Sequence, residues 1–339
     1  MPLLHPSAQE FSVQDTFGRT IDYLRLSITD RCNLRCRYCM PEAGVAPLEH
    51  ADILSYEELL RVAAAALRLG VRKIRVTGGE PLVRRGIVDF IGRLAALPVA
   101  AEITLTTNGL LLADLAAPLK AAGLSRVNVS LDTLHPERFA AITRRPGLEK
   151  VLAALAAAEA AGLTPLKINM VPIRGVNEDE IADFARLALE RPWQVRFIEF
   201  MPVSGGLDYP PESRFPAAEI VDALGRLGTL EPVPRQGAAG PARLYRYPGA
   251  PGEIGVIPAV STHFCGECNR LRVTADGRLR PCLLSAEEVD LRGVLRDPEA
   301  TPEQLEALLL GATTAKPERH GIGEEGFTPG KRRMQGIGG

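Results

Sequence analysis

Residues 23–39 read YLRLSITDRCNLRCRYC, a strand pattern followed at once by a loop with three cysteines. In the strand half, apolar and polar side chains alternate, as in a β-strand with one face against a hydrophobic layer. In the loop half, Cys32, Cys36 and Cys39 can hold three corners of a 4Fe–4S cluster and leave its fourth iron open. Structural zinc usually takes four ligands in two close pairs, and this loop has neither such pairs nor an adjacent histidine.

Five more strand patterns follow this first one, with helix patterns between them. The expected strands are Tyr23–Thr29, Arg72–Thr77, Glu102–Thr107, Arg126–Leu131, Pro165–Val171 and Gln194–Phe200. Ser55 with Glu58 and Asn177 with Glu180 each predict a capping box at a helix start, and Leu148–Ala161 predicts a further helix. Six strand–helix repeats predict a parallel sheet with right-handed crossovers, and therefore an open or closed α/β barrel.

The repeat stops near Met201–Gly206, where proline and glycine become frequent. We therefore expect three parts: a partial barrel over residues 1–205, a smaller region over 206–325, and an extended, basic, glycine-rich tail over 326–339.

The composition is that of a globular protein, with 46% hydrophobic and 24% charged residues. The 40 basic and 41 acidic residues give a net charge of −1, which argues against a nucleic-acid partner bound through a basic surface. No apolar run could cross a membrane, and the first ten residues lack a signal-peptide pattern. We expect a cytoplasmic protein, in which clustered cysteines indicate metal rather than disulfides.

The polar side chains of the expected strands form one alternating set. Helices must cover the apolar face of such a sheet, so the polar set should face the inside of the barrel. Five cations against one carboxylate would be costly in an enclosed space without an anion, which indicates a ligand with several phosphates. The alternative is that the assumed register of these strands is wrong in places, so that some of the cations lie on the rims of the barrel. The set comprises Arg25, Ser27, Lys73, Arg75, Thr77, Glu102, Thr104, Thr106, Asn128, Ser130, Lys167, Asn169, Gln194 and Arg196.

A second group of cysteines lies near the other end of the chain. Its members are Cys265, Cys268 and Cys282. Arg270 and Arg272 lie between them, and arginine is well suited to phosphate recognition through paired hydrogen bonds. We therefore favour a second cluster with an open iron. The alternatives are a zinc site completed by His263, and two arginines that merely occupy a solvated strand edge.

The loop C-x3-C-x2-C, with aromatic Tyr38 before its last cysteine, resembles the signature of radical S-adenosylmethionine (SAM) enzymes. Residues 77–81, TGGEP, resemble that family's motif for the methionine amino group. With the second cysteine group and the terminal Gly338-Gly339, nearly the whole chain resembles one family, the GTP 3′,8-cyclases (molybdenum cofactor biosynthesis protein A). Departures are minor, such as Leu284 where that family often has an aromatic residue.

The resemblance implies a partial (βα)6 TIM-like radical SAM barrel with a smaller C-terminal region that carries a second iron–sulfur cluster. It implies reductive cleavage of SAM to a 5′-deoxyadenosyl radical, which abstracts the C3′ hydrogen of GTP. Formation of the C3′–C8 bond then gives (8S)-3′,8-cyclo-7,8-dihydroguanosine 5′-triphosphate, the first step of molybdenum cofactor biosynthesis. The implied cofactors are two 4Fe–4S clusters and SAM.

The resemblance also implies residue roles. The metal ligands are Cys32, Cys36 and Cys39 for the first cluster, and Cys265, Cys268 and Cys282 for the second, whose open iron would meet the guanine. Contacts to SAM fall on Tyr38, Gly79, Ser130 and Met201. Contacts to GTP fall on Arg25, Arg75, Thr106, Lys167, Arg270 and Arg272, with Lys73 and Arg196 added from the inward polar set. Catalytic roles fall on Arg25, Arg270, Arg272, Gly338 and Gly339.

For the two terminal glycines, the alternative is a frayed terminus. The family further implies a homodimer, an electron donor of unknown identity, and cyclic pyranopterin monophosphate synthase as the downstream enzyme. A radical enzyme that modifies a peptide, and a nucleotide-binding regulator with structural zinc, are the competing functions. The inward cations speak against the first, and the lack of a G-x4-G-K-[ST] loop against the second.

Overall fold

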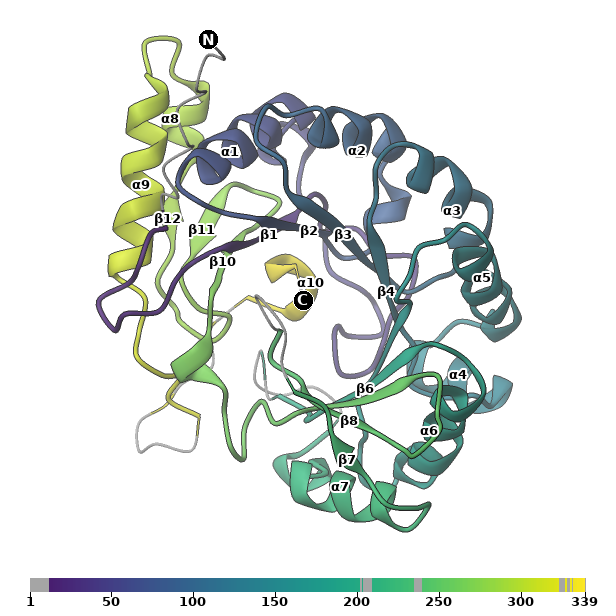
Figure 1. Ribbon diagram of the computed structural model, residues 1–339. Helices are drawn as coiled ribbons and strands as arrows, with labels where there is room; N and C mark the ends of the chain where they lie inside the picture. The colour runs from purple at the N-terminus through teal and green to yellow at the C-terminus, as the bar shows by residue number, and fades with distance from the viewer. Residues whose placement is uncertain are drawn as a thin grey trace, which may run out of the picture.

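The computed structural model describes residues 12–201, 203, 209–234, 240–322, 327, 330 and 332–338. One twelve-stranded sheet curves around the short C-terminal helix α10, and helices cover its outer side (Figure 1). Its strands run in the order β12-β11-β10-β1-β2-β3-β4-β5-β6-β9-β8-β7. The bounds are β1 Tyr23–Ser27, β2 Lys73–Thr77, β3 Glu102–Thr107, β4 Arg126–Ser130, β5 Lys167–Met170, β6 Gln194–Ile198, β7 Glu231–Pro232, β8 Arg243–Arg246, β9 Glu253–Ile257, β10 Arg270–Val273, β11 Arg278–Arg280 and β12 Val289–Asp290.

Ten α-helices and five short 3-10 helices (η) accompany these strands in the described residues. The α-helices are α1 Tyr56–Arg68, α2 Ile87–Ala95, α3 Leu112–Ala121, α4 Pro136–Thr143, α5 Leu148–Ala160, α6 Ile181–Glu190, α7 Ala217–Gly225, α8 Arg292–Arg296, α9 Pro302–Thr314 and α10 Met334–Ile337. The 3-10 helices are η1 His50–Asp52, η2 Pro81–Val83, η3 Glu178–Glu180, η4 Pro211–Ser213 and η5 Cys265–Glu267. None of these helices is long and apolar enough to span a membrane.

The six predicted strands are confirmed as β1 to β6, all parallel, with ends within two residues of the prediction. Their apolar sets, for example Leu24, Leu26, Ile74 and Val76, are fully buried. Burial of these side chains between sheet and helices is the main stabilising contribution to the barrel. The polar sets consequently face the other way.

The capping box at Ser55 is confirmed, because its side chain accepts from the Glu58 backbone and the Glu58 side chain accepts from the Ser55 backbone. The second predicted capping box is wrong. The Asn177 side chain instead accepts from the Ile173 backbone and donates to carbonyls of preceding loops. Glu180 binds Thr133 and Leu134, so α6 begins after a 3-10 turn.

The C-terminal region extends the same sheet at both of its edges. In the described residues, β9 pairs in parallel with β6, and β10 pairs in parallel with β1. Beyond them, β8 with β7 and β11 with β12 are antiparallel additions. Helix α9 packs beside α1 on the outside (Figure 1). The strands after residue 205 therefore complete the wall of the barrel.

Candidate active site

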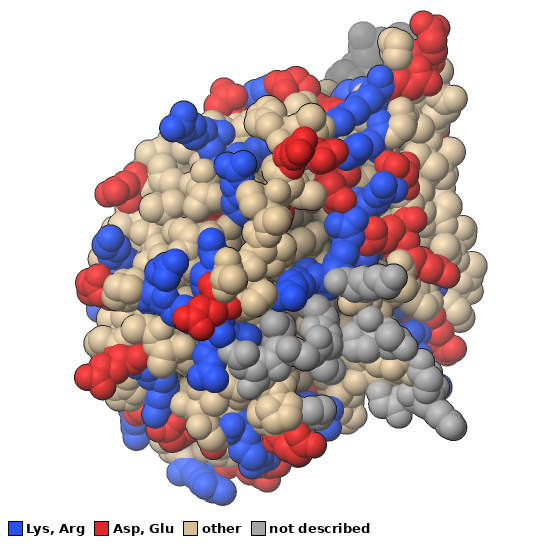
Figure 2. All heavy atoms as spheres, turned by 180° about the vertical axis from the view of Figure 1, so that it is seen from behind, with Lys and Arg blue, Asp and Glu red and all other residues tan. Residues whose placement is uncertain are grey.

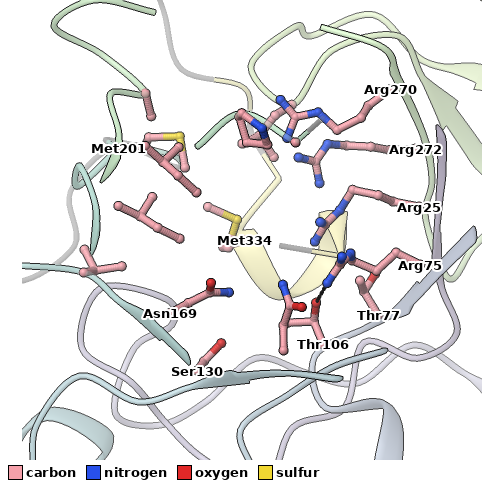
Figure 3. A pocket seen from close by; sticks show the side chains of 18 of the residues that line it. Arg25, Arg75, Thr77, Thr106, Ser130, Asn169, Met201, Arg270, Arg272 and Met334 are labelled. Carbon is pink, nitrogen blue, oxygen red and sulfur yellow. Dashed lines mark hydrogen bonds between the residues drawn. The ribbon is translucent and has the colours of Figure 1, made fainter. Parts of the chain in front are cut away.

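A cavity of about 360 Å³ lies inside the barrel. The strand register brings its charged wall together, because Arg25 is paired with Arg75 on one side and with Arg272 on the other. Figure 3 shows Arg270, Arg272, Arg25 and Arg75 one after another along this wall. Four guanidiniums from β1, β2 and β10 thus face one space.

The structure brings most of the predicted site residues to this cavity. Those that line it are Cys32, Cys36, Cys39, Cys265, Cys268, Cys282, Tyr38, Gly79, Ser130, Met201, Arg25, Lys73, Arg75, Thr106, Lys167, Arg196, Arg270 and Arg272. Gly338 contacts two of these arginines, whereas Gly339 lies outside the described residues.

Three members of the inward polar set do not line the cavity, because ion pairs or hydrogen bonds hold their side chains elsewhere. Glu102 forms ion pairs with Lys73, at 3.0 Å, and with Arg126. The Thr104 hydroxyl donates to the Ile74 carbonyl, and the Gln194 amide donates to Glu253. Ser27, a fourth member that does not line the cavity, packs against Gly338 instead. The alternation of polar and apolar residues predicted which face of the sheet these side chains occupy. Their position along the strand decides which of them reach the cavity.

Five cations of the cavity have lowered pKa values, among them Arg272, whose pKa burial holds well below its usual value. Burial first, and then the neighbouring cations, lower the pKa of Lys167 to about 6 and that of Lys73 to about 8. The pKa of Arg196 falls to about 9 and that of Arg25 to about 10, again chiefly through burial. These shifts reflect the loss of hydration on burial and, second, mutual repulsion, and a bound polyanion would offset both.

Several buried polar atoms of the cavity lack a hydrogen-bond partner among the described residues. They are Nε and Nη2 of Arg196 and the Oδ1 atoms of Asn128 and Asn169. Such atoms are costly unless a ligand or water satisfies them. Unsatisfied guanidinium donors together with free amide oxygens fit a ligand that has both phosphates and hydroxyl or amine groups.

Tyr23 is a cavity residue that the sequence reasoning missed. Arg75 donates to its hydroxyl and also to the Thr106 hydroxyl, at 3.1 Å. Burial alone would raise the pKa of Tyr23, but Arg75, Arg25 and Lys73 outweigh it and lower the pKa to about 7. Tyr23 belongs to the same alternating set as Arg25, so its place on the strand was the available signal.

The first cysteine loop is fixed by backbone hydrogen bonds. Arg35 N donates to the Thr143 carbonyl at 2.9 Å, and Arg37 N to the Ile142 carbonyl at 3.0 Å. Burial raises the pKa of Cys39 to about 12 and that of Cys36 well above its usual value. Thiolates at such buried positions need a positive partner, as an iron cluster supplies.

No three His, Cys, Asp or Glu side chains of the described residues converge on one metal ion. A cubane cluster, by contrast, holds its thiolates at separate corners. Three thiols in each group are the donors that a multi-iron cluster takes.

Two features lie beside the first cysteine loop: a buried hydrogen bond of Tyr38 and the TGGEP turn. The Tyr38 hydroxyl donates to Asp132, a buried residue that the sequence reasoning missed and whose pKa burial raises to about 6. A Cβ on Gly79 would lie 2.5 Å from the Arg31 carbonyl oxygen, so only glycine permits this approach. Glu80 accepts from Thr107 and Asn108, which holds the TGGEP turn in place.

At the second group, Arg270 Nη2 lies 3.8 Å from Cys268 Sγ. Burial would raise the pKa of Cys268, but Arg270 and Lys316 outweigh it and lower the pKa to about 6. Lys316 also donates to the Arg270 and Pro281 carbonyls, at 3.0 and 2.6 Å. Cys268 is therefore set up as a thiolate beside two cations, whereas burial raises the pKa of Cys265.

The tail enters the cavity from the end of the chain. The Gly338 carbonyl accepts hydrogen bonds from Arg25 Nη2 at 3.1 Å and from Arg272 Nη1 at 3.2 Å. Met334, on the helix that precedes it, projects into the middle of the same space (Figure 3). The described part of the tail is therefore docked inside the barrel.

Comparisons with known proteins agree with this geometry. A model of the radical SAM superfamily matches residues 26–188, and a model named Molybdenum Cofactor Synthesis C matches residues 193–322. The chain is 54% identical to a GTP 3′,8-cyclase from Geobacter sulfurreducens over 91% of this chain and 94% of that protein. It is 50% identical to one from Moorella thermoacetica over 96% of this chain and 100% of that protein.

Among solved structures, Streptococcus suis SuiB bound to S-adenosylmethionine is similar in fold. The TM-score is 0.59 at 14% identity, covering 83% of this chain and 67% of that one. The structure titled native anSMEcpe with bound AdoMet gives a TM-score of 0.52 at 15% identity, covering 79% and 77%.

Proposed function

Because the chain belongs to the GTP 3′,8-cyclase family of the radical SAM superfamily, we propose that its barrel cavity holds GTP between two iron–sulfur clusters. The protein is a radical SAM lyase of molybdenum cofactor biosynthesis that converts GTP to (8S)-3′,8-cyclo-7,8-dihydroguanosine 5′-triphosphate. Its cofactors are SAM and 4Fe–4S clusters. When bound, they supply the electron and the 5′-deoxyadenosyl radical that removes the C3′ hydrogen.

We assign the residues of the chain by their place in the cavity. Cys32, Cys36 and Cys39 hold the first cluster at one side, and Cys265, Cys268 and Cys282 hold the second at the other. SAM lies against Tyr38, Gly79, Ser130 and Met201. GTP is held by Arg25, Lys73, Arg75, Thr106, Lys167, Arg196, Arg270 and Arg272.

These cations supply position and charge. The lowered pKa values of Lys167 and Arg196 return toward normal when a triphosphate binds. Relief of the repulsion between the cations of the free cavity therefore contributes to substrate binding. Arg270 and Arg272 lie beside the second cysteine group, and Arg272 is also paired with Arg25. These two arginines are therefore placed between the phosphates of GTP and its guanine base. Holding both reactants in one orientation lowers the entropic part of the barrier. Arg25, Arg270, Arg272, Gly338 and Gly339 are the proposed catalytic residues.

The single observation that carries this proposal is the pair of cysteine triads on one cavity whose wall is rich in arginine and lysine. The proposed division is a barrel over 1–205, a cluster-bearing region over 206–325 that completes the wall of the barrel, and a tail over 326–339. A homodimer, a cytoplasmic location, a separate electron donor and cyclic pyranopterin monophosphate synthase as the next enzyme complete the proposal.

The test is an anaerobic turnover with reductant, SAM and GTP deuterated at C3′. We expect deuterium in the 5′-deoxyadenosine that forms. Unlabelled 5′-deoxyadenosine would contradict GTP, or its C3′ position, as the target. No 5′-deoxyadenosine from protein that carries both clusters would contradict the radical reaction itself.

A further inference from the structure

We propose that Lys316 is a positioning residue of the second iron–sulfur cluster and supplies a buried positive charge beside it. This role rests on the proposed function, which assigns Cys265, Cys268 and Cys282 to that cluster. Lys316 does not bind iron in this role. It acts through the backbone next to the thiols and through its charge.

Lys316 joins two of the three segments that carry these cysteines. It follows the end of α9 and is buried, with 3% of its surface exposed. Its Nζ atom donates hydrogen bonds to the Arg270 carbonyl at 3.0 Å and to the Pro281 carbonyl at 2.6 Å. Arg270 lies two residues after Cys268, and Pro281 directly precedes Cys282. One ammonium group therefore holds the backbone beside both thiols.

Arg19 attaches the third cysteine to the same part of the chain. Its Nη1 atom donates to the Cys265 carbonyl and to the Glu318 carbonyl, both at 2.8 Å. The charge of Arg19 is balanced by Asp15, whose Oδ2 atom lies 2.5 Å from Arg19 Nε. Hydrogen bonds therefore connect residues 316–318 to the backbone beside all three thiols.

The charge of Lys316 has no such partner within the described part of the chain. Its ammonium group forms no ion pair there, and its two acceptors are neutral carbonyls. On the face that Figure 2 shows, exposed lysines and arginines are interspersed with acidic side chains and are open to water. A buried ammonium group is costly unless an anion is close to it. Lys316 therefore requires a counter-charge inside the protein.

The second cluster supplies this counter-charge. Three thiolates outweigh the double positive charge of an oxidised 4Fe–4S core, so the assembly is anionic, and reduction adds one more negative charge. Arg270 and Lys316 lower the pKa of Cys268 to about 6 against the opposing effect of burial, which shows that both cations already favour an anion here. Because Arg270 is assigned to GTP, Lys316 is the cation whose partner is the cluster alone.

Two properties of the cluster follow from this placement. A fixed cation favours the reduced form, which is the more negative one, so Lys316 should raise the reduction potential of the second cluster. The hydrogen bonds to the backbone keep the thiols in place, and loss of such support commonly weakens metal binding about 10- to 100-fold. Lys316 should therefore also slow the loss of iron.

The experiment uses the full chain with both clusters and separates charge from position. Lys316→Gln removes the charge but keeps an amide that can donate to the carbonyls, whereas Lys316→Met removes both. Lys120→Gln is the matched control, because Lys120 on α3 also donates to a carbonyl, that of Gly162 at 2.8 Å, but at an exposed position. Redox titration followed by electron paramagnetic resonance gives the potential of each cluster. The signal that is absent from Cys282→Ser identifies the second one.

We expect Lys316→Gln to shift the midpoint potential of the second cluster to a more negative value and to leave that of the first cluster unchanged. Release of iron from the second cluster to a chelator should be about tenfold faster in Lys316→Met than in the unmodified protein. Lys120→Gln should match the unmodified protein in both measurements.

An unchanged potential in Lys316→Gln would overturn the role of the charge, and unchanged iron release in Lys316→Met would overturn the positioning role. Equal loss of iron from both clusters would overturn the proposal as a whole, because Lys316 would then act through general stability. Loss of the second cluster alone in either variant would support it. Failure of the proposed function gives a different result, since the unmodified protein would then show no second-cluster signal before any variant is compared.

Discussion

The guanidinium of Arg332 forms two hydrogen bonds with the carboxylate of Asp276, at 3.1 and 2.8 Å. Its Nε atom also lies 2.6 Å from Glu288. Arg332 therefore anchors the chain just before α10 to the wall formed by the C-terminal region. Anchored in this way, the tail can place the Gly338 carbonyl between Arg25 and Arg272.

Replacing Arg332 with alanine should lower the rate of deuterium transfer from GTP about tenfold, because charge-assisted hydrogen bonds of this kind each contribute about 1.5–3 kcal/mol. Iron content and SAM binding should be unchanged. Arg292→Ala, which removes an ion pair to Asp52 away from the tail, is the control. An equal loss in both variants would show that Arg332 acts through general stability.

Gly338→Ala should lower the same rate by at least about tenfold. The φ angle of Gly338 is +73°, and a Cβ there would lie 2.5 Å from Thr77 Oγ1 and 2.8 Å from Ser27 Cβ. At Gly336 a Cβ would meet nothing within 4 Å, so Gly336→Ala should behave like the unmodified protein. Equal activity of the two variants would contradict the docked position of the tail.

Binding of GTP should take up protons at neutral pH. Lys167, with a pKa of about 6, is largely neutral there in the free protein, and a triphosphate favours its charged form. The bound state then carries more protons, so affinity falls as pH rises from about 6 toward the higher pKa of the bound lysine.

Titration calorimetry in buffers of different ionisation enthalpy measures this uptake. The γ-phosphate releases protons when cations bind it and so opposes this uptake, and Lys167→Arg separates the two contributions. Arginine keeps its charge, so this variant should retain most of the affinity but show a smaller pH slope. An unchanged slope would mean that Lys167 does not titrate with binding.

The two cysteine groups should be separable by iron analysis. Cys282→Ser should reduce iron from about eight to about four atoms per chain and still allow cleavage of SAM to 5′-deoxyadenosine. Cys39→Ser should lose a similar amount of iron and all SAM cleavage. Electron paramagnetic resonance of the reduced variants distinguishes the remaining cluster. Loss of both clusters in either variant would contradict two independent sites.

Much of the site could be predicted from local pattern. Alternation in β1, β2, β5 and β6 placed Arg25, Arg75, Lys167 and Arg196 inside the barrel, because a strand has only two faces and the apolar one must be buried. Tyr23 was missed although it shares the face of Arg25, since an aromatic ring is ordinarily read as part of the apolar side.

Other parts of the site depend on contacts that no local pattern carries. Nothing near Arg272 indicates that β10 pairs with β1, yet this pairing sets it beside Arg25. Asn177 and Glu180 have the spacing of a capping box, but competing partners from other loops take both side chains. The position of Gly338 likewise depends on the hydrogen bonds from Arg332 to Asp276, two residues that are more than fifty positions apart in the sequence.

The pairing of β1 with β10 also governs when the protein can fold during its synthesis. Strand β1 is made early, but its neighbour is not available until residue 273 has emerged from the ribosome. Until then one edge of β1 is unpaired, and open strand edges favour association between nascent chains. The wall beside the first cysteine loop is therefore among the last parts to close, which leaves most of translation as a period when iron delivery can reach that loop from solvent.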